Sequence, residues 1–484
     1  MKKIPENGSA GPELLARLAD LRANDLPWRS GRVWAYVYPP GDDTEKIQKA
    51  AYMEFLSENA LDPTAFPSLR HMENDIISMC ASHLHGDQDT VGSFTSGGTE
   101  SCLLAVKTAR DWARKERGIK EPEIIVSSSA HAAFFKAAHY FDVKIVVVPV
   151  DNKTLRADVE KIRAAINPNT ALVVASASAY AHGVVDPVEE IAAITKKAGI
   201  LLHVDGCIGG FLLNYFRELG AKVPQYDFAV DGVTSMSMDL HKYAYCPKGA
   251  SVVLYKNRDL RKHQIFTCAG WNGYAMVNPT VQSTKSGGPV AAAWATMHAV
   301  GNAGYKERAR SMLEATRKLC KGIDAIPGLK VIGNPEMCLV AFVSEGFSIF
   351  HLIDAVNKRG WYVQAQLQAH DGAIPESAHL TVTTMSEALA DEFLADLAAS
   401  IPEAKAASFG PLAETFLPMA KQLSSADMSD DMIRGMLESA GLGSGGQRAS
   451  DPSADVNAIL NAMSPEMRER ILSVAMSELF RQPT

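Results

Sequence analysis

The sequence predicts an α/β protein with a large, mostly parallel β-sheet covered by helices on both faces and a smaller α+β part toward the carboxyl end. The chain has 484 residues, 47% of them hydrophobic and 21% charged. That composition can fill a large core, and the length exceeds what one core usually holds. Between residues 121 and 255, short apolar runs rich in β-branched residues alternate with amphipathic segments. This alternation is typical of α/β architecture.

The apolar runs are expected to be strands buried on both faces. Runs such as KIVVVPV and ALVVA lack the polar residue at every second position that a half-exposed strand would have. The amphipathic segments 157–166 and 187–198 lie between them and are expected to be covering helices. The predicted strands of this sheet are 123–126, 144–150, 171–175, 201–205, 228–230 and 251–255.

Segments outside this block complete the expected organisation. Residues 1–60 hold two helix-like pieces on either side of a tryptophan-, tyrosine- and proline-rich stretch at 27–40. Short strands are expected at 330–332, 338–343 and 379–383, and the glycine- and serine-rich stretch 441–450 is expected to be a flexible linker before one or two short helices. The expected units are an N-terminal segment (1–60), a large domain (61–290), a small domain (291–440) and a linker with a helical tail (441–484).

Composition and charge exclude several classes of protein. The net charge of −7 and the pI near 6.0 argue against a nucleic-acid partner or a charged membrane surface. Seven scattered cysteines without a C-x-x-C pair argue against a zinc site or a disulfide framework, and they favour a reducing cytoplasm. The sequence shows no signal peptide and no stretch of roughly 18 apolar residues, so we expect no transmembrane segment.

A glycine-rich motif, Ser96-Gly97-Gly98-Thr99-Glu100, precedes a long helical run. Backbone N–H groups at such a helix start, together with the positive end of the helix dipole, can bind a phosphate. An ordinary N-cap with an acidic first turn gives the same pattern. The motif alone is therefore a weak indication of a phosphate site.

Two further polar residues follow predicted strands. Asp205 ends the strand 201–205, at the edge where open α/β sheets bind ligands, and a carboxylate there could keep a pyridine nitrogen protonated. His131 follows the strand 123–126, and an imidazole can stack on a pyridine ring and exchange protons with it. A helix cap for Asp205 and a polar pocket at a helix start for His131 are the plainer alternatives.

The segment TSMSMDLHKYAYCPKG places Lys242 among small and apolar residues. Burial can lower the pKa of a lysine and make it a nucleophilic amine, and the nearby Ser237 and His241 could bind a phosphate. An exposed lysine is the commoner alternative. The phosphate motif, the histidine, the carboxylate and the lysine nevertheless occur in order at successive strand ends. This joint pattern predicts an enzyme that uses pyridoxal 5′-phosphate.

These motifs resemble the pyridoxal-phosphate-dependent group II decarboxylase superfamily and, within it, the sphingosine-1-phosphate lyase family. The segments SSSAHAAFFKAAHYF and HKYAYCPKG are specific, whereas TSGGTES and HVD are shared more widely. The resemblance runs from about residue 26 to about residue 300 and continues more weakly to about residue 440. It implies pyridoxal-phosphate fold type I, the aspartate-aminotransferase-like fold, and a homodimer with active sites at the subunit interface.

The resemblance also implies roles for individual residues. Lys242 would carry the cofactor as a Schiff base, Asp205 would pair with the ring nitrogen, and His131 would stack on the ring. The implied cofactor-binding residues, in full, are Ser96, Gly97, Gly98, Thr99, His131, Asp205, Ser237, His241, Lys242 and Gly288. The implied reaction cleaves sphingosine 1-phosphate or its dihydro form, a phosphorylated sphingoid base, into a long-chain aldehyde and phosphoethanolamine.

A substrate that ends in a phosphate dianion requires additional cations and hydrogen-bond donors. Lys248 is the natural candidate cation, with Tyr38 as a further phosphate ligand and Tyr180 as a donor or proton relay. A turn lysine and ordinary aromatic packing remain open alternatives for these residues. Lys285 and Asp62 depart from the family pattern, which has arginine and histidine there, and both departures bear on substrate preference.

Two other functions remain open at this stage. A pyridoxal-phosphate-dependent decarboxylase of tyrosine, aspartate or glutamate would use the same Lys242, His131 and Asp205. A binding protein that has lost catalysis would be expected to lack the lysine or the ring-nitrogen carboxylate, and both are present.

Overall fold

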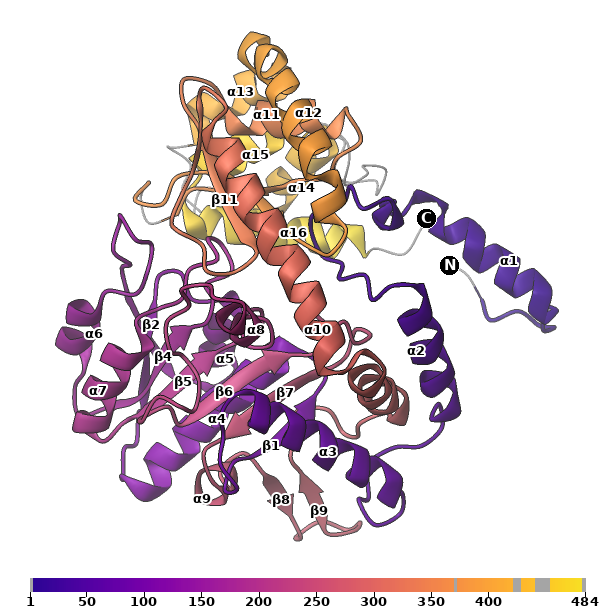
Figure 1. Ribbon diagram of the computed structural model, residues 1–484, viewed down its shortest axis with the longest axis vertical. Helices are drawn as coiled ribbons and strands as arrows, with labels where there is room; N and C mark the ends of the chain where they lie inside the picture. The colour runs from indigo at the N-terminus through magenta and orange to yellow at the C-terminus, as the bar shows by residue number, and fades with distance from the viewer. Residues whose placement is uncertain (1–2, 370–371, 421–427, 440–452, 481–484) are drawn as a thin grey trace.

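Two β-sheets organise the chain, and the long helical segment α10 (Gly287–Asp324), which is kinked at Gly301, connects them (Figure 1). This arrangement is seen in a computed structural model that describes residues 3–369, 372–420, 428–439 and 453–480. The larger sheet has seven strands and the smaller has four. A two-stranded hairpin of β8 (Phe266–Cys268) and β9 (Met276–Asn278) lies apart from both.

The seven-stranded sheet has the order β1-β7-β6-β5-β4-β2-β3. The five strands from β3 to β6 in this order pair in parallel, and β7 pairs antiparallel with both β6 and β1. The mostly parallel α/β sheet predicted from the sequence is therefore confirmed. The strands are β1 (Val91–Thr95), β2 (Glu123–Ser127), β3 (Lys144–Val148), β4 (Thr170–Ser176), β5 (Leu201–Asp205), β6 (Ser235–Asp239) and β7 (Ser251–Tyr255).

Alternate residues of the central strands enter separate cores on the two faces of the sheet. In β2, Ile125 packs into one hydrophobic cluster, whereas Ile124 and Val126 pack into the other. This explains why the apolar runs are unbroken in the sequence. The helices around this sheet are α3 (Pro67–His83), α4 (Gly98–Glu116), α5 (Ala132–Phe141), α6 (Val159–Ala165), α7 (Val188–Ala198), α8 (Leu213–Glu218) and α9 (Arg258–Arg261).

In the larger sheet, one strand prediction was wrong and two strands were not predicted; β8, β9 and β12 (Gln364–Gln366) outside it were not predicted either. Residues 228–230 form a turn, where Ala229 N donates to the Asp227 carboxylate. The sequences of β1 (VGSFT) and β6 (SMSMD) lack the β-branched runs that marked the other strands. Their pairing with β7, rather than their composition, makes them strands.

The smaller sheet is antiparallel, with the order β10-β11-β13-β12. Trp34, from the aromatic stretch before α2, packs against Trp361 and Phe393 of this part, with ring centroids 5.6 Å and 4.4 Å away. The N-terminal stretch therefore joins the smaller unit. Its elements are β10 (Leu329–Val331), β11 (Leu339–Ser344), α11 (Ile349–Asn357), β12 (Gln364–Gln366), β13 (Ser377–Thr381) and α12 (Ser386–Ala406). Helix α2 (Asp42–Glu54) packs on α10 instead.

Four helices near the carboxyl end form a separate hydrophobic core. They are α13 (Pro411–Ala420), α14 (Asp430–Ser439), α15 (Ala454–Ala462) and α16 (Pro465–Leu479). Ile433 of α14, Ile459 of α15 and Met467 of α16 are buried together in it. The helical tail predicted from the sequence is thus present as α15 and α16, and it packs with two helices assigned to the small domain. The predicted linker at 441–450 lies outside the described residues.

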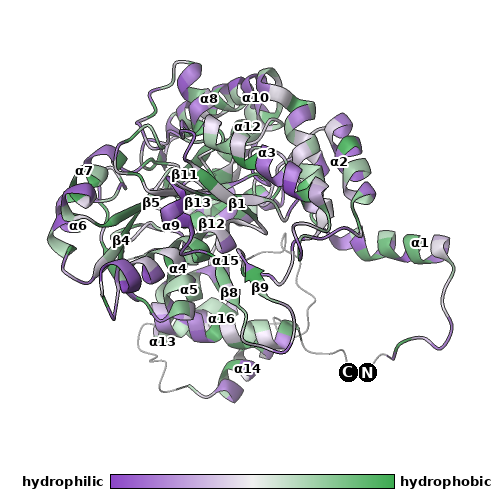
Figure 2. Ribbon diagram, turned by 90° about the horizontal axis from the view of Figure 1, so that it is seen from below, coloured by the Kyte–Doolittle hydropathy of each residue, from purple (hydrophilic) through white to green (hydrophobic). Residues whose placement is uncertain are grey.

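Helix α1 (Gly11–Leu21) stands away from the rest of the chain, with hydrophobic residues on its surface (Figure 2). It has no buried residue, and Leu15, Leu18 and Leu21 are between 56% and 70% exposed. Within the described ranges, no helix combines the length and the apolar character needed to cross a membrane.

Candidate active site

The carboxyl ends of β1, β2, β5 and β6 meet at one edge of the large sheet and surround a cavity of about 360 Å³. Parallel strands place their carboxyl ends together, which is where α/β sheets bind ligands. The cavity is lined by Ser96, Gly97, Gly98, Thr99, Glu100, Cys102, His131, Cys207, Asp239, His241 and Lys242. The structure thus brings the glycine-rich motif, the histidine and the lysine to one place, as the sequence predicted.

The glycine-rich motif forms the first turn of α4. Glu100 is buried, and one carboxylate oxygen accepts a hydrogen bond from Ser96 N at 2.6 Å, while the other accepts one from Val281 N at 2.7 Å. A Cβ atom on Gly98 would lie 2.7 Å from both carboxylate oxygens of Asp239 and 2.8 Å from Cys207 Sγ. Only glycine fits there, because the Asp239 carboxylate approaches the backbone so closely. The start of α4 also lines the cavity, where its N–H groups could bind an anion.

Lys242 is held by a carboxylate that the sequence analysis did not identify. Its Nζ lies 2.9 Å from Oδ2 of Asp239, a buried residue at the end of β6, and His241 Nε2 lies 3.5 Å from the same oxygen. Burial alone lowers the pKa of Lys242, but Asp239 outweighs it and raises that pKa above its ordinary value. The expected low pKa is therefore wrong for the ligand-free chain, because an ion pair compensates for burial.

Asp239 has further capacity as an acceptor. Its Oδ1 is buried and has no hydrogen-bond partner among the described residues. Burial raises the pKa of this carboxyl, but the charges of Lys242 and His241 more than offset burial and hold it below its ordinary value. Asp239 is therefore an ionised group at the bottom of the cavity.

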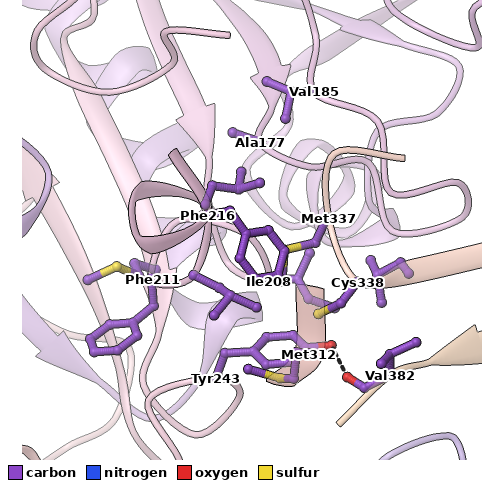
Figure 3. Close-up of a cluster of buried hydrophobic side chains, with 14 of the residues drawn as sticks. Ala177, Val185, Ile208, Phe211, Phe216, Tyr243, Met312, Met337, Cys338 and Val382 are labelled. Carbon is purple, nitrogen blue, oxygen red and sulfur yellow. Dashed lines mark hydrogen bonds between the residues drawn. The ribbon is translucent and has the colours of Figure 1, made fainter. Parts of the chain in front are cut away.

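The residue after the lysine anchors this loop to the smaller unit. Tyr243 is buried beside Met312 and Cys338, and its hydroxyl donates to Val382 O at 3.1 Å (Figure 3). The Tyr38 ring meets the Tyr243 ring edge-on at 4.9 Å. Lys242 is thus fixed between the two parts of the chain.

Asp205 lies behind the cavity wall in a buried hydrogen-bond network. Its Oδ1 accepts from Cys207 N at 3.0 Å and from Ser237 Oγ at 3.1 Å. His203 lies between Ser235 Oγ at 2.9 Å and Ser237 Oγ at 3.2 Å. The Asp205 carboxylate also lies within 4.8 Å of the thiols of Cys102 and Cys207, both of which line the cavity. The carboxylate is therefore oriented before any ligand binds.

Ser237 and His131 have distinct positions around this network. Ser237 does not line the cavity, and the structure gives its hydroxyl a contact with Asp205, so its role at a phosphate stays a prediction. His131 is the N-cap of α5, where its Nδ1 accepts from Ala133 N at 3.1 Å. This bond sets the orientation of an exposed imidazole in the cavity wall.

Tyr38, Tyr180 and Lys248 surround the outer side of the lysine. Lys248 Nζ lies 4.9 Å from the Tyr38 ring centroid, and no ion pair of Lys248 occurs among the described residues. Partial burial and the charge of Lys242 lower the pKa of Lys248. Tyr180 donates to Gln364 Oε1 at 2.7 Å and stacks on His379 at 4.6 Å, and burial raises its pKa. Its hydroxyl is therefore a donor at neutral pH.

Gly288 does not line the cavity with Lys242 in one chain. It lies in the first turn of α10, where a Cβ would lie 2.8 Å from the Tyr52 ring. Lys285 forms an ion pair with Glu73 and lines a different cavity, of about 610 Å³, beside α3. Asp62 accepts from Thr64 N at 2.8 Å and closes a turn. Within one chain these positions contribute nothing to the site.

Several lining or neighbouring residues were not predicted. Asp239 had one indication in the sequence, as the single acidic residue in an otherwise small and apolar segment three positions before the lysine. Gln364 and His379 come from the smaller sheet, more than 100 residues after the lysine, and nothing local in the sequence indicated them.

Comparison with known proteins agrees with this geometry. A family profile described as "Pyridoxal-dependent decarboxylase conserved domain" matches residues 28–345. A second, "Pyridoxal-dependent enzyme, C-terminal putative HTH domain", matches residues 414–477. The chain is 42% identical to the sphingosine-1-phosphate lyase of Oryza sativa subsp. japonica, over 81% of this chain and 73% of that protein. It is 38% identical to sphingosine-1-phosphate lyase 1 of Rattus norvegicus, over 85% and 73% respectively.

Solved structures with the same fold include close and distant relatives. The sphingosine-1-phosphate lyase of Burkholderia pseudomallei K96243 has a TM-score of 0.80 and 35% identity, and the match covers 84% of this chain and 93% of that one. The glutamate decarboxylase of Lactobacillus brevis has a TM-score of 0.74 and 20% identity, over 85% and 96% of the two chains. The second likeness concerns the fold alone.

Pyridoxal phosphate fits the residues present. Gly97, Gly98 and Thr99 at the start of α4 line the cavity, where backbone N–H groups could bind a phosphate, and the buried Asp205 behind its wall could pair with a ring nitrogen. Lys242 Nζ lies in the same cavity, where its amine can bond to the cofactor aldehyde. The donor set thus matches the phosphate, the ring nitrogen and the aldehyde of one molecule.

Replacing Asp239 with asparagine should make Lys242 easier to deprotonate. Because the ion pair at 2.9 Å holds the proton on Nζ, Asp239→Asn should move the pH midpoint of pyridoxal-phosphate uptake by the ligand-free chain downward by at least about one unit. Uptake is followed by the absorption of the bound cofactor. Asp231→Asn, which removes an exposed partner of Lys196, is the control. An unchanged midpoint in the Asp239 variant would contradict this account of the ion pair.

Acid should destabilise the fold through its buried histidines. Burial lowers the pKa of His203 to about 4, below the unfolded value of about 6.5. Between these values the unfolded chain binds a proton that the folded chain does not, so stability is lost as the pH falls through this window. The urea concentration at the midpoint of unfolding should decrease as the pH is lowered from about 6.5 to about 4. His203→Gln should flatten the drop more than His298→Gln, which changes an exposed histidine. If the urea midpoint falls equally steeply with pH in both variants, His203 is not the source of the acid sensitivity.

Proposed function

The chain belongs to the pyridoxal-dependent decarboxylase family and, within it, to the sphingosine-1-phosphate lyases, and from this premise we propose that it cleaves sphingosine 1-phosphate or its dihydro form. The products would be a long-chain aldehyde and phosphoethanolamine. The observation that carries the substrate assignment is Lys248, an exposed cation without an ion pair among the described residues, beside Tyr38 and on the outer side of Lys242. A substrate phosphate would supply the missing anion.

The reaction breaks the bond between carbons 2 and 3 of the substrate. Loss of the proton from the 3-hydroxyl turns carbon 3 into the aldehyde, and a proton added at carbon 2 completes phosphoethanolamine. When bound, pyridoxal phosphate supplies a ring that takes up the electron pair of the broken bond. Asp205, oriented by Ser237 Oγ and Cys207 N, would keep a proton on the ring nitrogen. His131 would cover one face of the ring from the opposite wall.

The aromatic residues around Lys242 would orient the substrate. Tyr38 and Lys248 would bind its phosphate, since a phenol and an ammonium are both donors to phosphate oxygens. The raised pKa of Tyr180 keeps its hydroxyl protonated at neutral pH, and this O–H donates to Gln364 Oε1 in the ligand-free chain. We assign it as a donor that would exchange this partner for the reacting oxygen. Tyr180 would relay a proton there and would not act as the initial base.

We also propose that the active protein is a cytoplasmic homodimer. Gly288 and Lys285 lie away from Lys242 in one chain, so they would complete a site only across a subunit interface. Large apolar side chains near the β8–β9 hairpin are exposed: Phe266 55%, Trp271 48%, Tyr274 53%, Val277 61% and Val281 59%. A second copy would cover such a surface. All seven cysteines are free, which fits a reducing compartment.

The direct test is to incubate the purified holoenzyme with sphingosine 1-phosphate and, separately, with L-tyrosine, L-glutamate and L-aspartate. Products are identified by mass spectrometry. A long-chain aldehyde with phosphoethanolamine would support the lyase. Carbon dioxide with an amine would keep the cofactor site and assign the chain to the decarboxylase alternative.

Lys242→Ala should abolish both turnover and the visible absorption of the bound cofactor. The fold should remain, because the side chain is partly exposed and its neighbour Tyr243 keeps the anchor to Val382. Absorption spectra and circular dichroism measure the two effects, with Lys248→Ala as a matched control that should retain the absorption. Residual turnover in the Lys242 variant would exclude this lysine from the reaction.

Lys248→Ala should lower kcat/KM for the phosphorylated substrate much more than for the unphosphorylated one. Loss of a charge-assisted hydrogen bond typically costs about 1.5–3 kcal/mol, so kcat/KM for the phosphorylated substrate should fall about 10- to 100-fold. The value for unphosphorylated sphingosine should change little. Lys256→Ala, which alters another exposed lysine, is the control. Equal losses for both substrates would remove Lys248 from the phosphate site.

A further inference from the structure

Helices α13 to α16, here called the helical module, match the profile described as a putative HTH domain, but their charges do not suit nucleic acid. Acidic residues outnumber basic ones between residues 409 and 479. The described arginines have partners within the protein: Arg434 pairs with Asp431 and Glu478, and Arg470 pairs with Asp430. A nucleic-acid-binding surface needs a patch of available cations. The charges of the module therefore argue against a nucleic-acid partner.

Helix α15 is attached to the smaller unit at both of its ends. At its start, the Asp354 carboxylate of α11 accepts from Ser453 N at 2.9 Å and from Ala454 N at 3.0 Å. At its end, Asn461 faces the segment that follows β12. The module is thus held against the smaller sheet at two points.

The second point of attachment is Gln368, two residues after β12. Its backbone N donates to Asn461 Oδ1 at 2.7 Å, and its side-chain Nε2 donates to Asn461 O at 2.8 Å. Its backbone O accepts from Arg468 Nη1 at 3.1 Å. Three polar groups of one residue are therefore bound by the module, which fixes both the position and the orientation of the segment.

Arg468 connects three elements with one guanidinium. Besides Gln368, it donates through Nε to Leu460 O at 2.6 Å and through Nη2 to Asn461 O at 2.8 Å. The carbonyls of Leu460 and Asn461 lie in the last turn of α15, where Leu460 O also accepts from Met463 N at 3.3 Å. Arg468 thus binds the end of α15 and holds the segment after β12 at the same time.

Strand β12 carries this contact to the active site. It is an edge strand, paired only with β13 in the smaller sheet. Its Gln364 accepts the hydrogen bond of Tyr180, and its Gln366 donates to Ala181 O at 3.2 Å. The loop is therefore bound to β12 through two adjacent residues of its own, Tyr180 and Ala181. An edge strand held on one side moves more readily than a central strand.

We propose that the helical module positions the active site: Arg468 and Asn461 hold Gln368, and through β12 they keep Tyr180 in place beside Lys242. Arg468 and Asn461 are positioning residues, since neither touches the cavity. The inference rests on the proposed function only in taking Tyr180 to act on the substrate. The hydrogen-bond connection between the module and Tyr180 is independent of the reaction.

The test uses the holoenzyme and combines hydrogen exchange with kinetics. Arg468→Met keeps the length of the side chain and removes its donors. Exchange of the amides between residues 364 and 368 should accelerate at least about 10-fold, and kcat/KM for sphingosine 1-phosphate should fall about 10-fold. The absorption of the bound cofactor should not change. Arg468→Lys, which retains one donor group, should restore part of both effects.

A double-mutant cycle separates positioning from a general loss of stability. In the background of Tyr180→Phe, which lacks the hydroxyl bound to Gln364, Arg468→Met should cost much less in kcat/KM than in the wild type. Arg434→Met, which removes an ion pair inside the module without touching Gln368, is the matched control and should leave exchange at β12 and kcat/KM unchanged. Additive losses in the cycle would overturn the proposal.

Other outcomes are equally decisive. Wild-type exchange and wild-type kcat/KM in the Arg468 variant would overturn the proposal. If Arg468→Met does not fold, Asn461→Ala removes the acceptor of the Gln368 amide and should show the same acceleration of exchange. If the wild type does not cleave sphingosine 1-phosphate, the proposed function fails, whereas the exchange measurement still confirms or refutes the hold of the module on β12.

Discussion

The buried ion pair between Asp239 and Lys242 is the interaction around which the site is built. A carboxylate this deep in the protein is stable only if it is paired, and its partners come from its own strand end. Its oxygens also fill the space beside Gly98, which requires glycine at the first turn of α4. One carboxylate thereby accounts for both the glycine in the phosphate motif and the protonation of the lysine.

The strand order of the large sheet makes this convergence possible. Because β1 has the same direction as β5 and β6, with the antiparallel β7 between β1 and β6, the glycine-rich motif after β1 arrives at the same edge as Asp205 and Lys242. Behind this edge, the His203–Ser237–Asp205 network is buried and hydrogen-bonded. Buried hydrogen bonds thus fix the Asp205 carboxylate, whereas Tyr180 is bound to an edge strand of the smaller sheet. The larger sheet thus holds Asp205 in a buried network, and the smaller sheet holds Tyr180 through its edge strand β12.

The sequence was informative wherever chemistry followed directly from local composition. Unbroken β-branched runs identified β2 to β5 and β7, and polar residues just after such runs identified His131 and Asp205. It failed where position in the fold decides the outcome. Strand β6 has no β-branched residue, and the turn at 228–230 has an apolar composition that resembles a strand. The raised pKa of Lys242 and the bond between Tyr180 and Gln364 each depend on a partner whose distance no local pattern encodes.

The helical module contacts the rest of the chain both through apolar side chains, such as Ala454 and Ala458 of α15, and through directed hydrogen bonds. Apolar side chains such as Ile459 and Met467 join its helices to one another, and burial of this kind is strong but has no direction. Gln368 donates two hydrogen bonds to Asn461 and accepts one from Arg468, and these are individually modest but strict in geometry. Such bonds add less to the overall stability than to the placement of one strand. That balance suits a part of the protein that positions an active-site tyrosine from a distance.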